Sequence, residues 1–295
     1  MANEHSATLT VGEALQKSAG FLAAKGVESS RLSAEILLAH VLSTDRLHVY
    51  LRFEEQLDAD AVTRLRELIV RRSQGEPVAY LIGYREFMGL KFEVSPAVLI
   101  PRPDTELLVK LVGKEISSSG KEPTILDLGC GSGCIGISLL MQCPQAHLLA
   151  VDISPEALEI CRRNAEFHKV TDRVNFIEGP LFNSVPQEYR GKLDWIVSNP
   201  PYIRDAEWSA LAVEIVKYEP RIALAAGPEG LDLYRPLIAE APQWLKPGGR
   251  LALEISPAVV DSVTQLLISE GLGEIGVHSD LGNNPRVITA GKCEK

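Results

Sequence analysis

Residues 194–203, DWIVSNPPYI, join an apolar run to an asparagine, two prolines and a tyrosine. Each proline fixes its own φ and restricts the preceding residue to extended backbone. Asn199 and Pro200 are therefore immobilised, and because proline has no N–H the local backbone presents carbonyl oxygens without matching donors. The side-chain oxygen of Asn199 is a further acceptor. Two fixed acceptors at a strand end can hold both N–H bonds of a planar NH2 group, and Tyr202 can pack against that plane.

Such a grip suits the alkylation of an amide or amino nitrogen. A carboxamide nitrogen is a poor nucleophile because its lone pair is delocalised, as in a peptide bond. Holding both N–H groups and aiming the nitrogen at an electrophilic methyl group favours in-line displacement, with most of the acceleration from proximity and orientation. The alternative is that Asn199-Pro200 only ends a strand with a turn.

A glycine-rich loop precedes this stretch in the chain. Residues 126–136, LDLGCGSGCIG, place Asp127 at the end of an expected strand, and Asp152 ends the next strand 25 residues later (152 − 127). Ligands of open α/β sheets bind outside the carboxyl ends of the strands, and a carboxylate such as Asp152 can accept hydrogen bonds from ribose hydroxyls. Glycines let the backbone approach such a ligand closely. The loop residues expected to do so are Gly129, Cys130, Gly131, Ser132 and Gly133.

Two ligands fit this loop. Gly131, Gly133 and Gly136 satisfy the dinucleotide fingerprint G-x-G-x-x-G. A dinucleotide loop faces a pyrophosphate, however, and an acidic residue directly ahead of it is electrostatically unfavourable. Asp127 suits a positively charged ligand, such as the amino group of S-adenosylmethionine. We therefore expect S-adenosylmethionine as cofactor, and a nicotinamide-dependent oxidoreductase would leave Asn199 without a role.

The composition narrows the class of protein. The chain has 295 residues, 45% hydrophobic and 23% charged, which is typical of a soluble globular protein. It has no apolar run long enough to span a bilayer and no N-terminal basic region followed by an apolar stretch, so we expect a cytoplasmic protein. Neither Cys-x-x-Cys nor His-Glu-x-x-His occurs, so no metal site is expected. The net charge of −9 argues against a nucleic-acid substrate.

The elements that position these residues fall into three parts. Helical periodicity over residues 8–73 predicts a small all-α domain at residues 1–77. Residues 78–105 mix aromatics, glycines and prolines in short alternating runs, which predicts a β-hairpin linker without helix. Strands and helices then alternate over residues 106–295, which predicts a Rossmann-like α/β domain with a mostly parallel sheet covered on both faces and a final hairpin.

Four arginines cluster in the last helical segment of the small domain. They are Arg64, Arg66, Arg71 and Arg72. They form either a solvated helix face with ion pairs or a docking surface for an acidic partner.

Three stretches resemble the HemK/PrmC family of class I S-adenosylmethionine-dependent methyltransferases. They are residues 83–109, 197–203 and 218–238, and the likeness covers nearly the whole chain. The resemblance implies methyl transfer to the side-chain amide N5 of the glutamine in the Gly-Gly-Gln motif of class I peptide-chain release factors. The motif Asn-Pro-Pro-Tyr alone leaves open a glutamine of a large-subunit ribosomal protein, or an amino group of a base in DNA or RNA. We expect a monomer that recognises a protein substrate.

The resemblance also implies roles for residues. Asn199 touches both cofactor and substrate, and Pro200, Pro201 and Tyr202 complete the grip on the substrate. The catalytic group is Asn199 with Pro200 and Tyr202, and the cofactor site comprises Asp127, Gly129, Cys130, Gly131, Ser132, Gly133, Asp152, Leu181 and Asn199.

The chain departs from the family near the adenine. Pro180 stands where relatives often have an acidic residue, and Leu181 where they often have an aromatic one. Leu181 can still supply an apolar face, but a carboxylate contact to the adenine amino group is missing. Arg102 and Thr105 are expected either to shape a cap over the site or to serve only the linker.

Overall fold

The computed structural model describes residues 9–119 and 122–293, which form two compact units. The smaller unit takes in the described part of residues 1–83 together with residues 212–218, and the larger unit takes in residues 84–211 and 219–293. The N-terminal residues that bear on a secretion signal lie mostly outside the described residues. The predicted boundaries at residues 77 and 105 stay a prediction.

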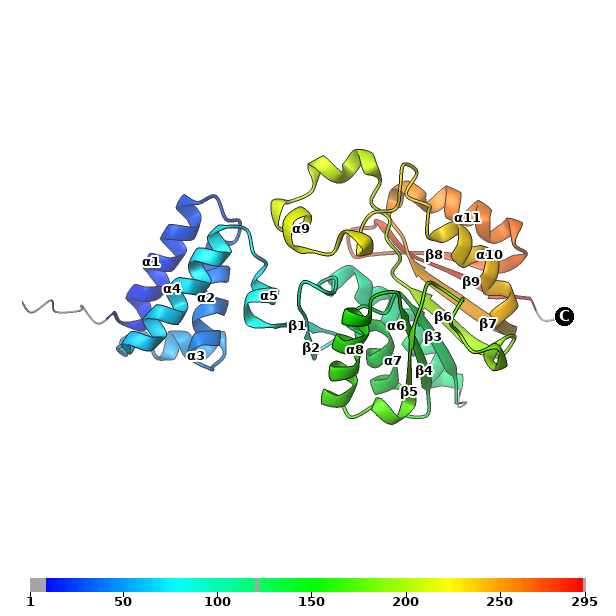
Figure 1. Cartoon of the computed structure of the whole chain (residues 1–295), viewed down its shortest axis with the longest axis horizontal. Helices are drawn as coiled ribbons and strands as arrows, with labels where there is room; N and C mark the ends of the chain where they lie inside the picture. The colour runs from blue at the N-terminus through cyan, green and yellow to red at the C-terminus, as the bar shows by residue number, and fades with distance from the viewer. Residues whose placement is uncertain (1–8, 120–121, 294–295) are drawn as a thin grey trace, which may run out of the picture. The chain divides into compact units, whose positions relative to one another are not determined.

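The smaller unit is helical, as its periodicity predicts (Figure 1). Its helices are α1 (Val11–Ala24), α2 (Ser30–Val41), α3 (Arg46–Leu51), α4 (Ala59–Ser73), α5 (Val78–Ile82) and α9 (Val213–Tyr218). Thr10 and Glu13 form a capping box at the start of α1, and the Asp58 side chain caps α4. Leucine, valine and alanine side chains from α1, α2 and α4 form its core. Among the described residues, no helix is both long and apolar enough to cross a membrane.

Two features of this unit differ from expectation. The linker contains a short helix, α5, which buries Ala79, Tyr80 and Leu81 and ends at Gly83 in a left-handed conformation. Five residues are too few for a periodic pattern to be visible in the sequence. Helix α9 follows the Asn-Pro-Pro-Tyr stretch by ten residues in the chain, yet it packs within the helical unit.

The arginines of α4 are mostly paired. Arg72 is buried, and its Nη1 lies 2.7 Å from Glu214 Oε2 of α9 and 3.0 Å from the Glu76 carbonyl oxygen. Arg71 Nε donates to Glu76 at 2.8 Å, and Arg64 Nε lies 3.0 Å from Asp60 Oδ2. Arg72 therefore joins α4 to α9 and is not part of an exposed docking surface.

The larger unit begins with an antiparallel hairpin, β1 (Tyr84–Phe87) and β2 (Leu90–Glu93). A seven-stranded sheet follows in the order β5-β4-β3-β6-β7-β9-β8. Its strands are β3 (Thr124–Leu128), β4 (His147–Asp152), β5 (Val174–Glu178), β6 (Leu193–Ser198), β7 (Leu245–Glu254), β8 (Leu272–Ser279) and β9 (Pro285–Lys292). The first five strands in the spatial order are parallel, and β9 is antiparallel to both β7 and β8. The predicted mostly parallel sheet is confirmed.

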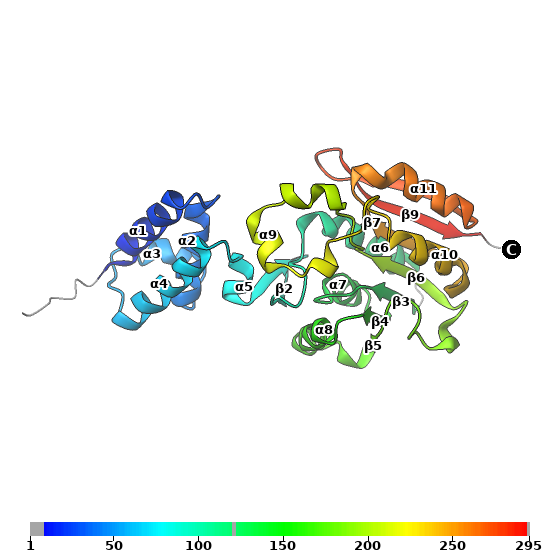
Figure 2. The same cartoon turned by 45° about the horizontal axis from the view of Figure 1, so that its top comes forward.

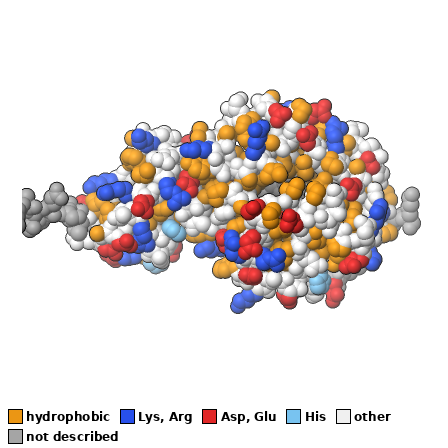
Figure 3. Space-filling view, viewed as in Figure 1, with side chains coloured by type: hydrophobic (Ala, Val, Ile, Leu, Met, Phe, Trp, Pro, Cys, Tyr) orange, Lys and Arg blue, Asp and Glu red, His pale blue; other side chains and the backbone are white. Residues whose placement is uncertain are grey.

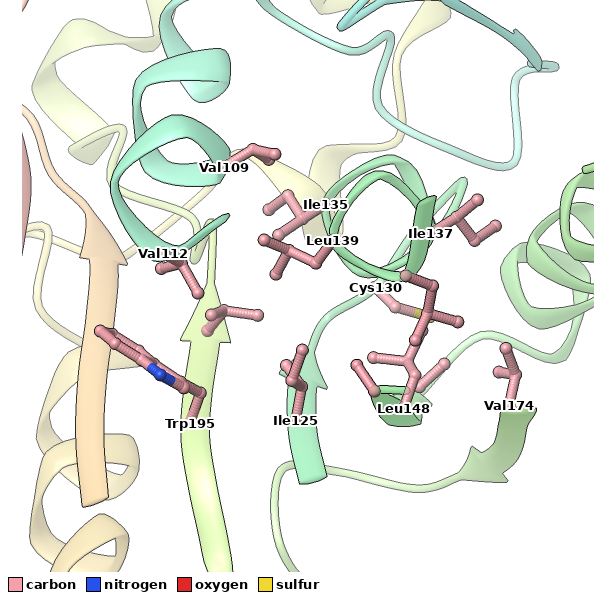
Figure 4. Close-up of a cluster of buried hydrophobic side chains, with 14 of the residues drawn as sticks. Val109, Val112, Ile125, Cys130, Ile135, Ile137, Leu139, Leu148, Val174 and Trp195 are labelled. Atoms are coloured by element: carbon pink, nitrogen blue, oxygen red, sulfur yellow. The ribbon is translucent and has the colours of Figure 1, made fainter. Parts of the chain in front are cut away.

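Helices cover both faces of this sheet (Figures 1 and 2). One face carries α6 (Glu106–Ser119), α7 (Cys134–Gln142) and α8 (Pro155–Phe167), and the other carries α10 (Tyr234–Trp244) and α11 (Val260–Ser269). In Figure 4, Val112 of α6 and Ile135 and Leu139 of α7 lie on the side of β3 and β6, near Ile125 and Trp195, whereas Ile137 of α7 points away from these two strands. Because both faces are covered, the central strands are almost continuously apolar.

We predict that Arg72→Ala destabilises the helical unit much more than Arg64→Ala. Arg72 is buried and its removal leaves Glu214 and the Glu76 carbonyl without their donor, which should lower the free energy of unfolding by about 1–3 kcal/mol. Arg64 forms an exposed pair within one helix, where about 0.5 kcal/mol or less is expected. Urea unfolding followed by circular dichroism compares the two variants, and equal losses would contradict the structural role of Arg72.

Candidate active site

The carboxyl ends of three neighbouring strands meet at one edge of the sheet. In the parallel registers, Leu128 at the end of β3 pairs with Val151 of β4 on one side and with Ser198 of β6 on the other. The segments that follow these strands enclose a cavity of about 360 Å³. Figure 3 shows apolar side chains gathered around a hollow in this unit. Predicted site residues in the cavity wall are Gly129, Cys130, Gly131, Ser132, Asp152, Leu181, Asn199, Pro200 and Pro201.

The glycine loop holds its backbone open towards the cavity. Gly129 and Gly131 have φ of 69° and 54°, in the left-handed region, and no atom lies within 4 Å of where a Cβ would stand. Both positions therefore require glycine and leave space for a ligand. Gly133 lies outside the cavity wall, and a Cβ there would stand 2.6 Å from Cys161 Sγ. Its lack of a side chain serves the packing of α7 on α8.

Asp152 ties the glycine loop to the end of β4. Its Oδ2 accepts a hydrogen bond from Gly131 N at 2.8 Å, and its Oδ1 accepts one from Ser154 N at 3.0 Å. Burial raises the pKa of the Asp152 carboxyl, and these backbone donors oppose that rise. The carboxylate also lines the cavity, so it can accept ribose hydroxyls in addition to the loop.

Asp127 lies beneath the loop and not in the cavity wall. It is fully buried, and its Oδ2 accepts a hydrogen bond from Gly136 N in the first turn of α7 at 3.0 Å. Its Oδ1 is buried without a partner. Burial raises the pKa of this carboxyl to about 7. The structure thus gives Asp127 a role in joining β3 to α7, and its contact with the cofactor stays a prediction.

The Asn-Pro-Pro-Tyr residues separate into two groups. Asn199, Pro200 and Pro201 line the cavity, and Asn199 Nδ2 donates to Thr105 Oγ1 at 3.3 Å. Tyr202 lies outside the cavity wall and packs against the core beneath α10 and α11, where burial raises its pKa to about 12. The expected packing of Tyr202 against the substrate therefore stays a prediction.

The segment before α6 forms another wall of the cavity. Arg102 and Thr105 both line it, in agreement with a role beyond the linker. Glu219, which is buried, accepts hydrogen bonds from Arg102 Nη2 at 2.6 Å and Ile100 N at 3.3 Å and so holds this wall in place.

Sequence reasoning missed two buried carboxyls, Glu219 and Glu254. Glu254 ends β7, one strand beyond Asn199, and it is almost inaccessible. A carboxylate at the end of the apolar run RLALE, next to the strand that carries Asn199, was the signal for it. Glu219 lies between a short helix and a 3-10 turn, where no local sequence pattern indicates that its side chain is buried.

The residues present fit an adenosyl cofactor. No atom lies within 4 Å of where a Cβ would stand at Gly129 or Gly131, so a ligand can approach the backbone of the loop closely. Asp152 offers a carboxylate at the end of the next strand. Apolar side chains of Ile135 and Leu181 line the same cavity. Among the described residues, no group of three potential metal ligands is found.

Comparison with known proteins identifies the family. Residues 13–83 match the PrmC N-terminal domain, and residues 103–227 match the methyltransferase small domain. The chain is 39% identical over 279 residues to the release factor glutamine methyltransferase of Geobacter sulfurreducens, covering 95% of each chain. The chain belongs to the release factor glutamine methyltransferase family.

A second relative agrees with this family, and a solved structure agrees with the fold. The release factor glutamine methyltransferase of Chlorobaculum tepidum is 41% identical over 263 residues, which cover 88% of this chain and 89% of the relative. The solved catalytic domain of hMettl16, in complex with an RNA hairpin, shares the fold with a TM-score of 0.55 at 14% identity, over 76% of this chain and 81% of that chain. The predicted family, the methyltransferase class and S-adenosylmethionine as cofactor are confirmed.

We predict that Asp127→Asn gains stability relative to the wild type as pH rises. A folded-state pKa of about 7 exceeds the ordinary aspartate value, so the stability that protonated Asp127 contributes is present at low pH and is lost as pH rises towards 7. Between pH 5 and pH 8 the difference in unfolding free energy should shift by about 2 kcal/mol in favour of Asp127→Asn. Urea unfolding at several pH values measures it, with exposed Asp172→Asn as control. A pH-independent difference would be inconsistent with a protonated buried carboxyl.

We also predict that Pro180→Asp binds S-adenosylmethionine more tightly. Pro180 lines the cavity next to Leu181, and a carboxylate there can accept a hydrogen bond from the adenine amino group. One such bond should lower Kd by roughly threefold to tenfold. Calorimetric titration measures the affinity, with Pro180→Asn as the uncharged comparison. An unchanged Kd would show that proline in place of an acidic residue at position 180 does not weaken the binding of S-adenosylmethionine.

Proposed function

We propose that this chain transfers a methyl group from S-adenosylmethionine to the side-chain amide N5 of the glutamine in the Gly-Gly-Gln motif of class I peptide-chain release factors. The carrying observation is that Asn199 and Pro200 share one cavity with the glycine loop and Asp152. The names of its relatives in Geobacter sulfurreducens and Chlorobaculum tepidum support the release factor as substrate.

The chain's own residues act by positioning. Bound S-adenosylmethionine supplies an electrophilic methyl group on a positively charged sulfur. Asn199 Nδ2 donates a hydrogen bond to Thr105 Oγ1, so Asn199 Oδ1 is left to accept a hydrogen bond from the substrate. Oδ1 and the Pro200 carbonyl then hold the two N–H bonds of the glutamine amide. The glutamine nitrogen forms the new N–C bond as the sulfur–methyl bond breaks, and the electron pair of that bond stays on the sulfur of the departing thioether. The nitrogen then releases one proton, and orientation supplies most of the acceleration.

The carboxylates serve binding more than chemistry. Positive charge at the sulfur disappears as the methyl group moves, so a nearby negative charge stabilises the ground state at least as well as the transition state. We infer that Asp152, and Asp127 through the loop, set cofactor affinity. We further infer that the helical N-terminal part, residues 1–77, docks the protein substrate to the catalytic part, residues 106–295. The proposal includes a monomeric, cytoplasmic enzyme.

We predict that the purified chain methylates a full-length class I release factor on one glutamine. Labelled S-adenosylmethionine should mark the Gly-Gly-Gln glutamine, as mass spectrometry of the modified peptide would show. Asn199→Ala removes a positioned acceptor and should lower kcat/KM by roughly a hundredfold while the cofactor still binds.

The matched controls are a release factor with Gln→Ala in the motif, a large-subunit ribosomal protein fraction and duplex DNA. Label on the release factor that survives Gln→Ala would contradict the assigned acceptor. Label on the ribosomal protein or DNA, with none on the release factor, would replace the proposed substrate.

A further inference from the structure

A buried carboxyl lies beside Asn199 on the next strand. Strands β6 and β7 pair in parallel with Ser198 opposite Leu253, so Asn199 and Glu254 follow at the same edge of the sheet. Glu254 is only 1% exposed, and its backbone carbonyl accepts a hydrogen bond from Tyr234 Oη at 2.7 Å, which fixes its place. Its Oε2 is buried without a partner. A buried carboxyl so incompletely satisfied calls for a functional explanation.

Thr105 connects this carboxyl to Asn199. The Thr105 hydroxyl is buried and accepts a hydrogen bond from Asn199 Nδ2 at 3.3 Å. Burial raises the pKa of the Glu254 carboxyl, and the nearby Thr105 hydroxyl opposes that rise, as a donor facing a carboxylate would. A hydroxyl has a single proton, so once this proton is given to Glu254 only lone pairs face Asn199. The Asn199 amide must then turn its NH2 group towards Thr105. Donation by Thr105 to an ionised Glu254 would therefore determine the direction of the hydrogen bond between Thr105 and Asn199.

The orientation of this amide decides what the site can hold. With NH2 directed at Thr105, the Oδ1 atom is left for the substrate and accepts from an amide NH2 group. With the amide turned by 180°, Thr105 would donate to Oδ1, and the site would present an NH2 group that repels an amide NH2 and suits a carboxylate instead.

We propose that Glu254 is a positioning residue that, through Thr105, fixes the orientation of the Asn199 amide and so makes the site selective for glutamine over glutamate. The catalytic consequence of this proposal rests on the proposed methyl transfer to glutamine. Its structural part rests on the Asn199–Thr105 hydrogen bond and on the buried Glu254 carboxyl, whose Oε2 has no partner. Glu254 touches neither cofactor nor substrate in this role.

The orientation of the Asn199 amide should depend on pH, because it depends on whether Glu254 is ionised. Burial raises the pKa of its carboxyl to about 7. A protonated carboxyl can donate to Thr105, which frees the Thr105 proton to turn towards Asn199 Oδ1. The titratable and charged groups that face Glu254 are Arg102, Asp104, Cys134, Tyr202, Tyr234 and Arg286. Since ionised Glu254 orients the amide, kcat should rise with pH through about 7.

The first test observes the amide directly and needs no protein substrate. In 15N-labelled full-length enzyme, the side-chain NH2 resonances of Asn199, assigned by their loss in Asn199→Ala, should titrate with a midpoint near pH 7. The titration should vanish in Glu254→Gln and in Thr105→Val, and it should persist in Thr105→Ser. Thr289→Val removes an equally buried hydroxyl on β9 and serves as the control that leaves the titration unchanged.

The second test measures the consequence in turnover and selectivity. At saturating S-adenosylmethionine, which suppresses the effect of Asp127 on cofactor binding, Glu254→Leu and Thr105→Val should each lower kcat roughly tenfold with an unchanged cofactor Kd. Both should also reduce the preference for a release factor with glutamine over one with glutamate in its motif by roughly tenfold in Kd. Thr105→Ser and Thr289→Val should keep wild-type values.

The outcomes separate the two proposals. Asn199 resonances that do not titrate, or a titration that persists in Glu254→Gln, would overturn the positioning role whatever the substrate is. Wild-type kcat and selectivity in Thr105→Val would overturn its catalytic consequence. If the Asn199 NH2 resonances titrate as expected but the enzyme methylates no release factor, the proposed function is refuted and the positioning role of Glu254 stands.

Discussion

The parallel pairing of β3 with β4 and β6, and of β6 with β7, is the constraint on which the rest of the site depends. It brings the ends of four strands, and hence the glycine loop, Asp152, Asn199 and Glu254, to one edge of the sheet. Each of these residues lies at or just past a strand end because strands of this length carry the chain across the apolar core and no further. Two apolar cores hold the strands from both faces. The strand ends that carry the site residues are therefore held in place by the buried strands and not by the conformation of the loops.

Much of this arrangement could be predicted from the sequence because strong local sequence patterns indicate it. Short apolar runs that end in glycine, aspartate or Asn-Pro indicated the strands and the polar residues at their carboxyl ends. The glycines of the loop agree with the left-handed backbone found at Gly129 and Gly131. The resemblance to a known family then supplied the cofactor. The positions of Asn199, Pro200 and most of the loop in one cavity follow directly from these signals.

Side-chain direction was harder to predict. Successive residues of a strand point to opposite faces, so Asp127, one position before the last residue of β3, turns to α7 and misses the cavity wall. Tyr202 follows two prolines, and which way it turns depends on the core beneath α10 and α11, which lies distant in sequence. Glu254 becomes notable only when β7 is known to lie beside β6. These features are set by tertiary packing, which a single sequence records only indirectly.

Helix α9 places a few residues from the middle of the catalytic sequence within the helical unit. Glu214 of α9 pairs with buried Arg72 of α4, and Tyr218 Oη donates to the Gln74 carbonyl at 3.3 Å. The next residue, Glu219, returns to the larger unit and grips Arg102. The unit boundary thus cannot be cut at a single peptide bond. An exchange of N-terminal domains between relatives would have to transplant residues 212–218 as well, although some 130 residues separate the two segments in the chain (212 − 83 = 129).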